Sequence, residues 1–186
     1  MAEEPAKDVS SEIPAMGIVE VFTGDGKGKT SAALGIALRA LGHQRRVHVI
    51  YFMKGEFPYG EQRILAELPN ITFAKFGFET FVEPTNVKPE EKEEARKALE
   101  EARRAMLSLE YDVIILDEVN VAVSWKLIDI EEVIKLIKDK PENVELILTG
   151  RYADARIIEL ADLVTDMVKV KHPYDKGILS RKGIDY

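Results

Sequence analysis

The chain has 186 residues, with 33 acidic and 26 basic side chains, a formal net charge of −7 and no cysteine. The absence of cysteine excludes a disulfide framework and a cysteine-ligated zinc site. The acidic balance argues against a general nucleic-acid binder, which would carry a basic face. With 46% hydrophobic residues, the chain has enough apolar material for one sizeable core.

Residues 1–16 carry several acidic side chains and two prolines, Pro5 and Pro14, without a basic start or an apolar run. This composition predicts a disordered lead-in and is unlike a signal or transit peptide. No stretch approaches the ~20 apolar residues that a membrane span needs. We therefore expect a cytoplasmic protein with one domain over residues 17–186, and neither nucleic acid nor membrane as a partner.

From residue 18 onward, short β-branched runs alternate with helical patterns. The predicted strands cover residues 18–22, 47–53, 71–76, 113–116 and 144–148, with a weaker sixth run at 163–170. The predicted helices cover residues 29–41 and 89–110 and two shorter segments around 130–137 and 157–161. Nearly unbroken apolar strands that alternate with helices are typical of a parallel sheet covered on both faces. The pattern predicts an α/β three-layer sandwich with a mostly parallel sheet of about six strands.

The first predicted strand runs into a glycine-rich turn that opens directly into a helix, which is the context of a phosphate-binding P-loop. In such a loop, backbone N–H groups and the helix N-terminus attract phosphate oxygens. The expected ATP-binding residues are Gly24, Asp25, Gly26, Lys27, Gly28, Lys29, Thr30 and Ser31. Three residues separate Gly24 from Gly28-Lys29-Thr30, where the strict motif has four. The loop is therefore either one residue short or built differently at its start.

Lys29 and Thr30 are the residue types on which P-loop chemistry depends. A lysine at this position supplies a point charge to phosphate oxygens, and a threonine hydroxyl can bind Mg²⁺. We expect Lys29 to lie outside the core, so that its replacement leaves folding intact.

Two further segments place polar side chains at the ends of predicted strands. Residues 113–118 form an apolar strand that ends in Asp117 and Glu118, a Walker B pattern in which either carboxylate could hold Mg²⁺ or act as a base. Thr30, Asp117 and Glu118 are thus the expected Mg²⁺ ligands. Arg151 follows the fifth strand and is expected near phosphate, because the carboxyl ends of parallel strands meet at one edge.

Several segments together are similar to the P-loop-type ATP:corrinoid adenosyltransferases, a family that shares the shortened loop. The matching segments are Thr23 to Thr30, Ala33-Leu34-Gly35, Phe52-Met53-Lys54-Gly55, Leu116 to Asn120, Thr149-Gly150-Arg151 and the closing Lys182 to Tyr186. The resemblance covers residues 17–186 and implies a RecA-like P-loop fold. It also implies that a Co(I) corrinoid attacks the 5′ carbon of ATP and that triphosphate leaves, in adenosylcobalamin synthesis or salvage.

The same resemblance implies roles for individual residues. Lys29 and Glu118, with Mg²⁺, would stabilise the leaving triphosphate, and no side-chain nucleophile is expected because the cobalt is the nucleophile. Phe78 and Phe81 are expected on the corrinoid side, although Thr80 stands where the family usually has tryptophan. A homodimer and a flavoprotein reductant are the protein partners that the resemblance suggests.

Two other functions fit the motifs alone. A RecA-like Mg-ATPase or small-molecule kinase would use Glu118 as base and release ADP. A nucleotide-sensing regulatory module would bind ATP without turnover.

Overall fold

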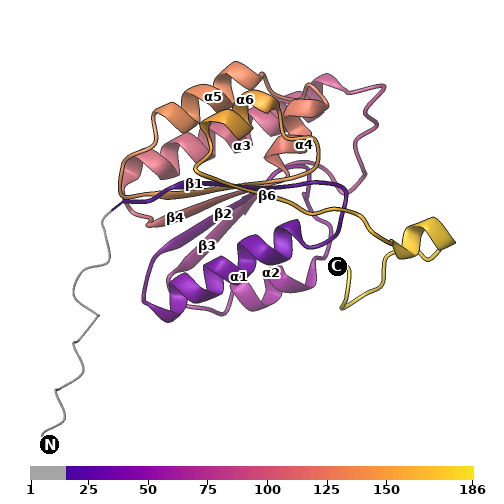
Figure 1. The fold of residues 1–186 in the computed structure, drawn as a ribbon, viewed down its shortest axis with the longest axis horizontal. Helices are drawn as coiled ribbons and strands as arrows, with labels where there is room; N and C mark the ends of the chain where they lie inside the picture. Colours follow the sequence, from indigo (N-terminus) through magenta and orange to yellow (C-terminus); the bar gives the residue numbers. More distant parts are fainter. Residues whose placement is uncertain (1–15) are drawn as a thin grey trace, which may run out of the picture.

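Six parallel strands form one sheet in the computed structural model, which describes residues 16–186 (Figure 1). The strands are β1 (Val19–Thr23), β2 (Val47–Tyr51), β3 (Ile71–Lys75), β4 (Val113–Asp117), β5 (Glu145–Thr149) and β6 (Leu163–Asp166), in the order β3-β2-β4-β5-β1-β6. The predicted fold class and number of strands are confirmed, and the last strand is shorter than predicted. The expected lead-in, residues 1–16, lies outside the described residues except for Met16, which is exposed.

Helices cover both faces of the sheet, as a three-layer sandwich requires (Figure 1). One face carries α1 (Lys29–Gly42) and α2 (Gly60–Leu65), and the other carries α3 (Pro89–Ser108), α4 (Val119–Ser124), α5 (Ile130–Lys138) and α6 (Ala155–Leu160). A 3₁₀ helix, η2 (Pro173–Lys176), follows β6. None of the helices in residues 16–186 is both long and apolar enough to span a membrane.

The sequence pattern did not predict α2, α4 or η2, and their burial shows why. Only Gln62 and Leu65 are buried in the six residues of α2, whereas five consecutive residues of α4, from Val119 to Val123, are buried. α2 therefore has too few buried apolar residues to show a helical stripe in the sequence. α4 is buried on every side, so its sequence shows no alternation of an apolar and a polar face.

The core has one apolar layer on each side of the sheet. On β4, Ile114 and Leu116 pack in the layer beneath α3 to α6, while Val113 and Ile115 pack in the layer beneath α1 and α2. All of these side chains are buried, and complete burial of one such side chain contributes about 1.5–3 kcal/mol. The unbroken apolar runs of the central strands thus reflect burial on both faces of the sheet, whereas the edge strand β6 is largely exposed.

The strand order brings four connections to one edge of the sheet. Since all the strands are parallel, the loops after β1, β2, β4 and β5 leave from the same edge. β5 lies between β1 and β4, so the strand before the P-loop and the strand that ends in Asp117 are not neighbours. Ligand sites of parallel sheets form at such an edge, and the predicted site residues lie there.

Candidate functional site

The P-loop occupies residues 24–28, between β1 and α1, as the sequence predicted. Gly24 has a φ of 92°, and a Cβ there would lie 2.1 Å from Asp166 Oδ1 and 2.6 Å from the Met167 carbonyl oxygen. The Gly26 N–H donates to that same Met167 oxygen at 2.6 Å. The start of the loop is therefore pressed against the chain that leaves β6, and only glycine fits at position 24.

Lys29 is the first residue of α1, and its ammonium closes the loop from inside. Its Nζ donates to the carbonyl oxygens of Gly24 at 2.8 Å and Gly26 at 2.7 Å. The side chain is 8% exposed, and burial lowers the pKa of Lys29. Lys29 thus lies outside the apolar core, as expected, but its side chain is buried and bridges two carbonyl groups of its own loop. That its replacement leaves folding intact stays a prediction.

Asp117, at the end of β4, is fully buried and its carboxylate is surrounded by donors. Oδ1 accepts hydrogen bonds from the hydroxyls of Thr30 at 2.8 Å and Thr149 at 2.7 Å. Oδ2 accepts from Lys54 Nζ at 2.5 Å. Both oxygens are thus used within the protein, and Asp117 is not among the residues that line the adjacent cavity.

Glu118 follows in a left-handed conformation, with a φ of 67°, that turns its side chain away from that of Asp117 toward the cavity. Its backbone N–H donates to Thr149 Oγ1 at 3.0 Å. Burial and the neighbouring Asp117 carboxylate raise the pKa of Glu118, while Lys54, Lys29 and Arg151 act in the opposite direction. A non-glycine residue held at positive φ is costly and is concentrated at functional sites. Glu118 is therefore the cavity-facing member of the carboxylate pair.

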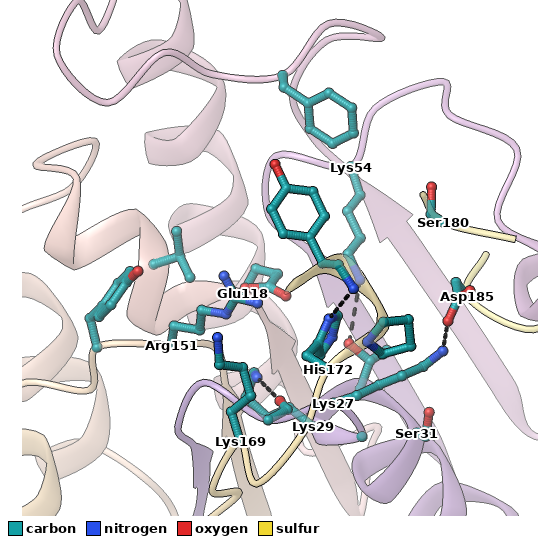
Figure 2. A pocket seen from close by; sticks show the side chains of 18 of the residues that line it. Lys27, Lys29, Ser31, Lys54, Glu118, Arg151, Lys169, His172, Ser180 and Asp185 are labelled. Carbon is teal, nitrogen blue, oxygen red and sulfur yellow. Dashed lines mark hydrogen bonds and ion pairs between the residues drawn. The ribbon is translucent and has the colours of Figure 1, made fainter. Parts of the chain in front are cut away.

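A cavity of about 840 Å³ opens at this edge of the sheet, and Figure 2 shows part of its lining. Lys27, Lys29, Thr30 and Ser31, which line it from the P-loop, are called the polar wall here. The apolar wall consists of the lining residues Phe52, Met53, Phe81, Val82, Val121 and Trp125. A volume of this size is typical of small-molecule sites.

The structure brings most of the predicted site residues to this cavity. Those that line it are Gly26, Lys27, Gly28, Lys29, Thr30, Ser31, Glu118, Arg151 and Phe81, and those that do not are Gly24, Asp25, Asp117 and Phe78. Asp25 is exposed, and its Oδ1 is 4.0 Å from Arg151 Nε. Phe81 is 82% exposed, and its ring centroid lies 6.2 Å from that of Phe57.

The segment after β6 was not predicted to take part, although it forms a wall of the cavity. Residues 168–174 and 178–181 line it, as does Asp185. Asp185 is ion-paired with Lys27, whose Nζ also donates to the Ile184 carbonyl oxygen at 3.1 Å (Figure 2). The signal that could have found this wall is the closing part of the sequence, residues 170–173 and 182–186, which resembles the family pattern.

Two other lining residues, Lys54 and Trp125, were missed as well. Lys54 stands in a segment that was used only for the resemblance, and Trp125 follows the short, unpredicted α4 as its C-cap. Trp125 is the only tryptophan of the chain. Its position in the apolar wall depends on the path of α4, which no periodicity indicated.

The oxygen donors at the polar wall fit a magnesium ion. The Thr30 hydroxyl and the Glu118 carboxylate are hard ligands of the kind that Mg²⁺ prefers, and Mg²⁺ is commonly bound by one or two such groups together with phosphate oxygens. Within residues 16–186, no cluster of three His, Cys, Asp or Glu side chains could hold a metal ion. A bound nucleotide would therefore have to supply the remaining ligands.

Known proteins of one family are similar to this protein over nearly its whole chain. A family model described as "ATP:corrinoid adenosyltransferase BtuR/CobO/CobP" matches residues 15–186. A corrinoid adenosyltransferase of Escherichia coli K12 is 37% identical over 170 residues, which cover 91% of this chain and 86% of the relative. Corrinoid adenosyltransferase CobA of Salmonella typhimurium LT2 is 36% identical with the same coverage. A corrinoid adenosyltransferase of Sinorhizobium sp is 33% identical over 97% of this chain and 85% of its own length. With its P-loop, carboxylate pair and two-walled cavity, the chain belongs to the ATP:corrinoid adenosyltransferase family.

Proposed function

We propose that this protein transfers the 5′-deoxyadenosyl group of ATP to the Co(I) centre of a corrinoid and releases triphosphate, in the synthesis or salvage of adenosylcobalamin. The observation that carries the proposal is a single cavity that a phosphate-binding loop and a set of apolar side chains line together. That arrangement places a polyphosphate and a large, flat, apolar partner within reach of one another. Membership of the family supports the same reaction.

The polar wall is suited to a triphosphate. Lys27, Lys29 and Arg151 supply positive charge along the cavity, and the N-terminus of α1 points its unpaired N–H groups at the loop. Charge that develops on the departing oxygen would be met by fixed cations and dipoles, which need no reorganisation during the reaction. Lys29 and Glu118 are the residues to which we assign most of this stabilisation.

We assign Mg²⁺ to Thr30 and Glu118. When bound there with the phosphates, the ion would supply charge neutralisation to the leaving group. Asp117, whose oxygens accept from Thr30, Thr149 and Lys54, holds the Thr30 hydroxyl in place from behind. This assignment replaces the sequence-based alternative in which either carboxylate of the pair could contact the metal.

The apolar wall receives the corrinoid in this proposal. Phe81 and Trp125 offer aromatic surface at the cavity, and burial of such surface favours binding of a large flat ring system. The cobalt supplies the electron pair that forms the bond to the 5′ carbon, and the bond from that carbon to the phosphate oxygen breaks with its pair. The protein's task is to hold the two reactants in line, which is worth several kcal/mol.

A homodimer, a flavoprotein that delivers the electrons and a cytoplasmic location stay predictions from the resemblance and composition. Phe78 lies outside the cavity lining and is 43% exposed, so its role toward the corrinoid also stays a prediction.

The decisive experiment is a product test. The protein is incubated with ATP, Mg²⁺ and chemically reduced cobalamin, the cobalt spectrum is followed, and phosphate products are separated by ion chromatography. We expect adenosylcobalamin and tripolyphosphate in equal amounts. Release of ADP and orthophosphate without any corrinoid would identify the ATPase or kinase alternative instead.

A further inference from the structure

Lys54 is a buried cation to which the proposed reaction gives no role. Its side chain is 9% exposed and reaches from the turn after β2 to Asp117, where Nζ lies 2.5 Å from Oδ2. The same Nζ lies 3.4 Å from Thr30 Oγ1. Figure 2 shows Lys54 and Lys29 entering the site from opposite sides, with Lys54 also part of the cavity lining.

The turn that carries Lys54 is built around a strained residue. Met53 has a φ of 57°, in the left-handed region that non-glycine residues rarely adopt. The N–H groups of Lys54 and Gly55 both donate to the Phe76 carbonyl oxygen, at 3.0 and 3.2 Å. Strain of this kind persists only where surrounding contacts fix it, and it is concentrated at functional sites.

Gly77 also holds the turn at Met53 in place. A Cβ on Gly77 would lie 2.8 Å from Met53 Cα, so the chain after β3 is packed directly onto the strained residue. The direction of the Lys54 side chain is thus determined by backbone contacts between the loops that follow β2 and β3.

The surroundings of the ammonium group are those of a bound cation. The carboxylate of Asp117 lies on one side, and the rings of Tyr59 and Tyr51 lie 4.8 and 5.5 Å away. Aromatic faces at this distance attract a positive charge. Burial alone would lower the pKa of Lys54, but the carboxylates of Asp117 and Glu118 outweigh it and raise the pKa, which keeps the group charged.

The contacts of Thr30 show that the Lys54 ammonium lies beside an oxygen that we assign as a metal ligand. The Thr30 hydroxyl donates its proton to Asp117 Oδ1 at 2.8 Å, which leaves only the oxygen lone pairs for a cation. Lys54 Nζ, 3.4 Å away, is the positive group next to that oxygen. Asp117 Oδ2 is likewise taken by Lys54, which is why Asp117 is not among the metal ligands that we assign.

We propose that Lys54 is a tethered cation that holds the place of the divalent ion beside Thr30 and Asp117, so that the metal binds only together with the nucleotide phosphates. The inference rests on the proposed binding of Mg·ATP at this loop. Without Lys54, Asp117 Oδ2 would be a free carboxylate oxygen near the Thr30 hydroxyl, and two such oxygens attract a hard cation by themselves. Lys54 acts through Asp117 and Thr30 and is a positioning residue.

Mn²⁺ binding to the nucleotide-free protein tests this directly, because electron paramagnetic resonance counts free Mn²⁺. The variants are K54M, K54R and, as a control with the same loss of charge, K75M. Lys75 lies outside the cavity lining and its Nζ is 3.8 Å from Glu56. We expect K54M to bind Mn²⁺ about tenfold more tightly than the wild type, the scale of one removed neighbouring charge. K54R and K75M should bind as weakly as the wild type.

Thermal unfolding gives a second readout. Loss of Lys54 leaves the buried Asp117 uncompensated, so K54M should melt at a lower temperature than the wild type and should be restored by Mn²⁺ more than the wild type is. Equal Mn²⁺ affinity and equal response to Mn²⁺ in K54M and the wild type would overturn the proposal.

The wild type alone provides a test if K54M does not fold. Equilibrium dialysis against the same tripolyphosphate solution corrects for the Mn²⁺ that tripolyphosphate chelates by itself. More Mn²⁺ should then bind on the protein side than without tripolyphosphate, and tight binding without any phosphate would overturn the proposal. No arm of the experiment contains corrinoid, so its outcome is separate from that of the product test.

Discussion

Lys27 of the phosphate loop is ion-paired with Asp185 of the C-terminal segment, so the nucleotide-binding loop already has an anionic partner before any nucleotide binds. A triphosphate must compete with that carboxylate for Lys27. We expect D185N to bind tripolyphosphate about threefold more tightly than the wild type, which is the scale of a partly exposed ion pair. Isothermal titration calorimetry measures this affinity. D139N, on the far side of the fold, removes the same charge and should bind as the wild type does; weaker binding by D185N would mean that Asp185 orients Lys27 for the ligand.

Lys29 should contribute both to the ligand and to the fold. Replacement by Met removes a cation from the polar wall, which is expected to cost about 3 kcal/mol of transition-state stabilisation. It also leaves the Gly24 and Gly26 carbonyl oxygens without their donor, at about 1 kcal/mol of stability. Turnover of ATP and urea unfolding check the two effects separately. Full activity in K29M is the result that contradicts the assignment.

Substitutions of Asp117, the last residue of β4, and of Glu118, which follows it, should affect stability and activity differently. D117N leaves the buried Lys54 without its partner and is expected to lose about 3 kcal/mol of stability. E118Q changes a cavity-facing group and should unfold much as the wild type does, while its activity requires higher Mg²⁺ concentrations. Urea unfolding and a Mg²⁺ titration of activity measure the difference. Equal loss of stability in both variants would mean that Glu118 is structural too.

Much of this site could be predicted from the sequence because its polar residues follow strands that are easily recognised. The P-loop and the Asp117–Glu118 pair each come directly after an apolar run, and a parallel sheet must bring them to one edge. The buried position of Lys29 could not be predicted, because it depends on how the loop folds back on its own carbonyl groups.

The sequence did not predict Lys54, Trp125 or the cavity wall formed by the segment after β6, for a different reason. Their positions depend on a strained turn, a six-residue helix and a segment without a regular repeat. None of these leaves a periodic pattern in the sequence. The sequence also left open which of Asp117 and Glu118 faces the cavity. The two side chains point in different directions because the backbone of Glu118 is left-handed, and no sequence pattern indicates this.

Stability should depend on pH through Glu20 on β1. Burial and the adjacent Glu145 carboxyl raise the pKa of Glu20 from its ordinary value of 4.5 to about 7. The unfolded chain loses this proton near its ordinary pKa while the folded chain retains it, so stability falls as pH rises from 4.5 to about 7 and then levels off.

E20Q should abolish this loss. Because the side chain is partly exposed, we expect a gain of only about 1 kcal/mol at alkaline pH and almost none near about pH 4. Urea unfolding at the two pH values checks this, with the exposed E67Q as control. A gain of the same size at both pH values would rule out titration of Glu20 as its cause.

The single tryptophan makes corrinoid binding visible. Because Trp125 lines the cavity, a bound corrinoid, which absorbs in the near ultraviolet, should quench most of the protein's fluorescence. F81A should weaken cobalamin binding about fivefold through lost aromatic contact, whereas F78A should leave it unchanged, since only Phe81 lines the cavity. A larger effect of F78A would restore the sequence-based expectation for Phe78, and W125F should remove the signal.

The order of strands also determines when the phosphate loop can be in place during folding. β1 pairs only with β5 and β6, which lie more than a hundred residues later in the chain. The first strand therefore has no neighbour until the last two have formed, and such non-local pairing slows folding. Although the loop comes first in the sequence, it should be among the last parts to acquire protection from hydrogen exchange. Chains that end before β5 should leave β1 unpaired and prone to aggregate.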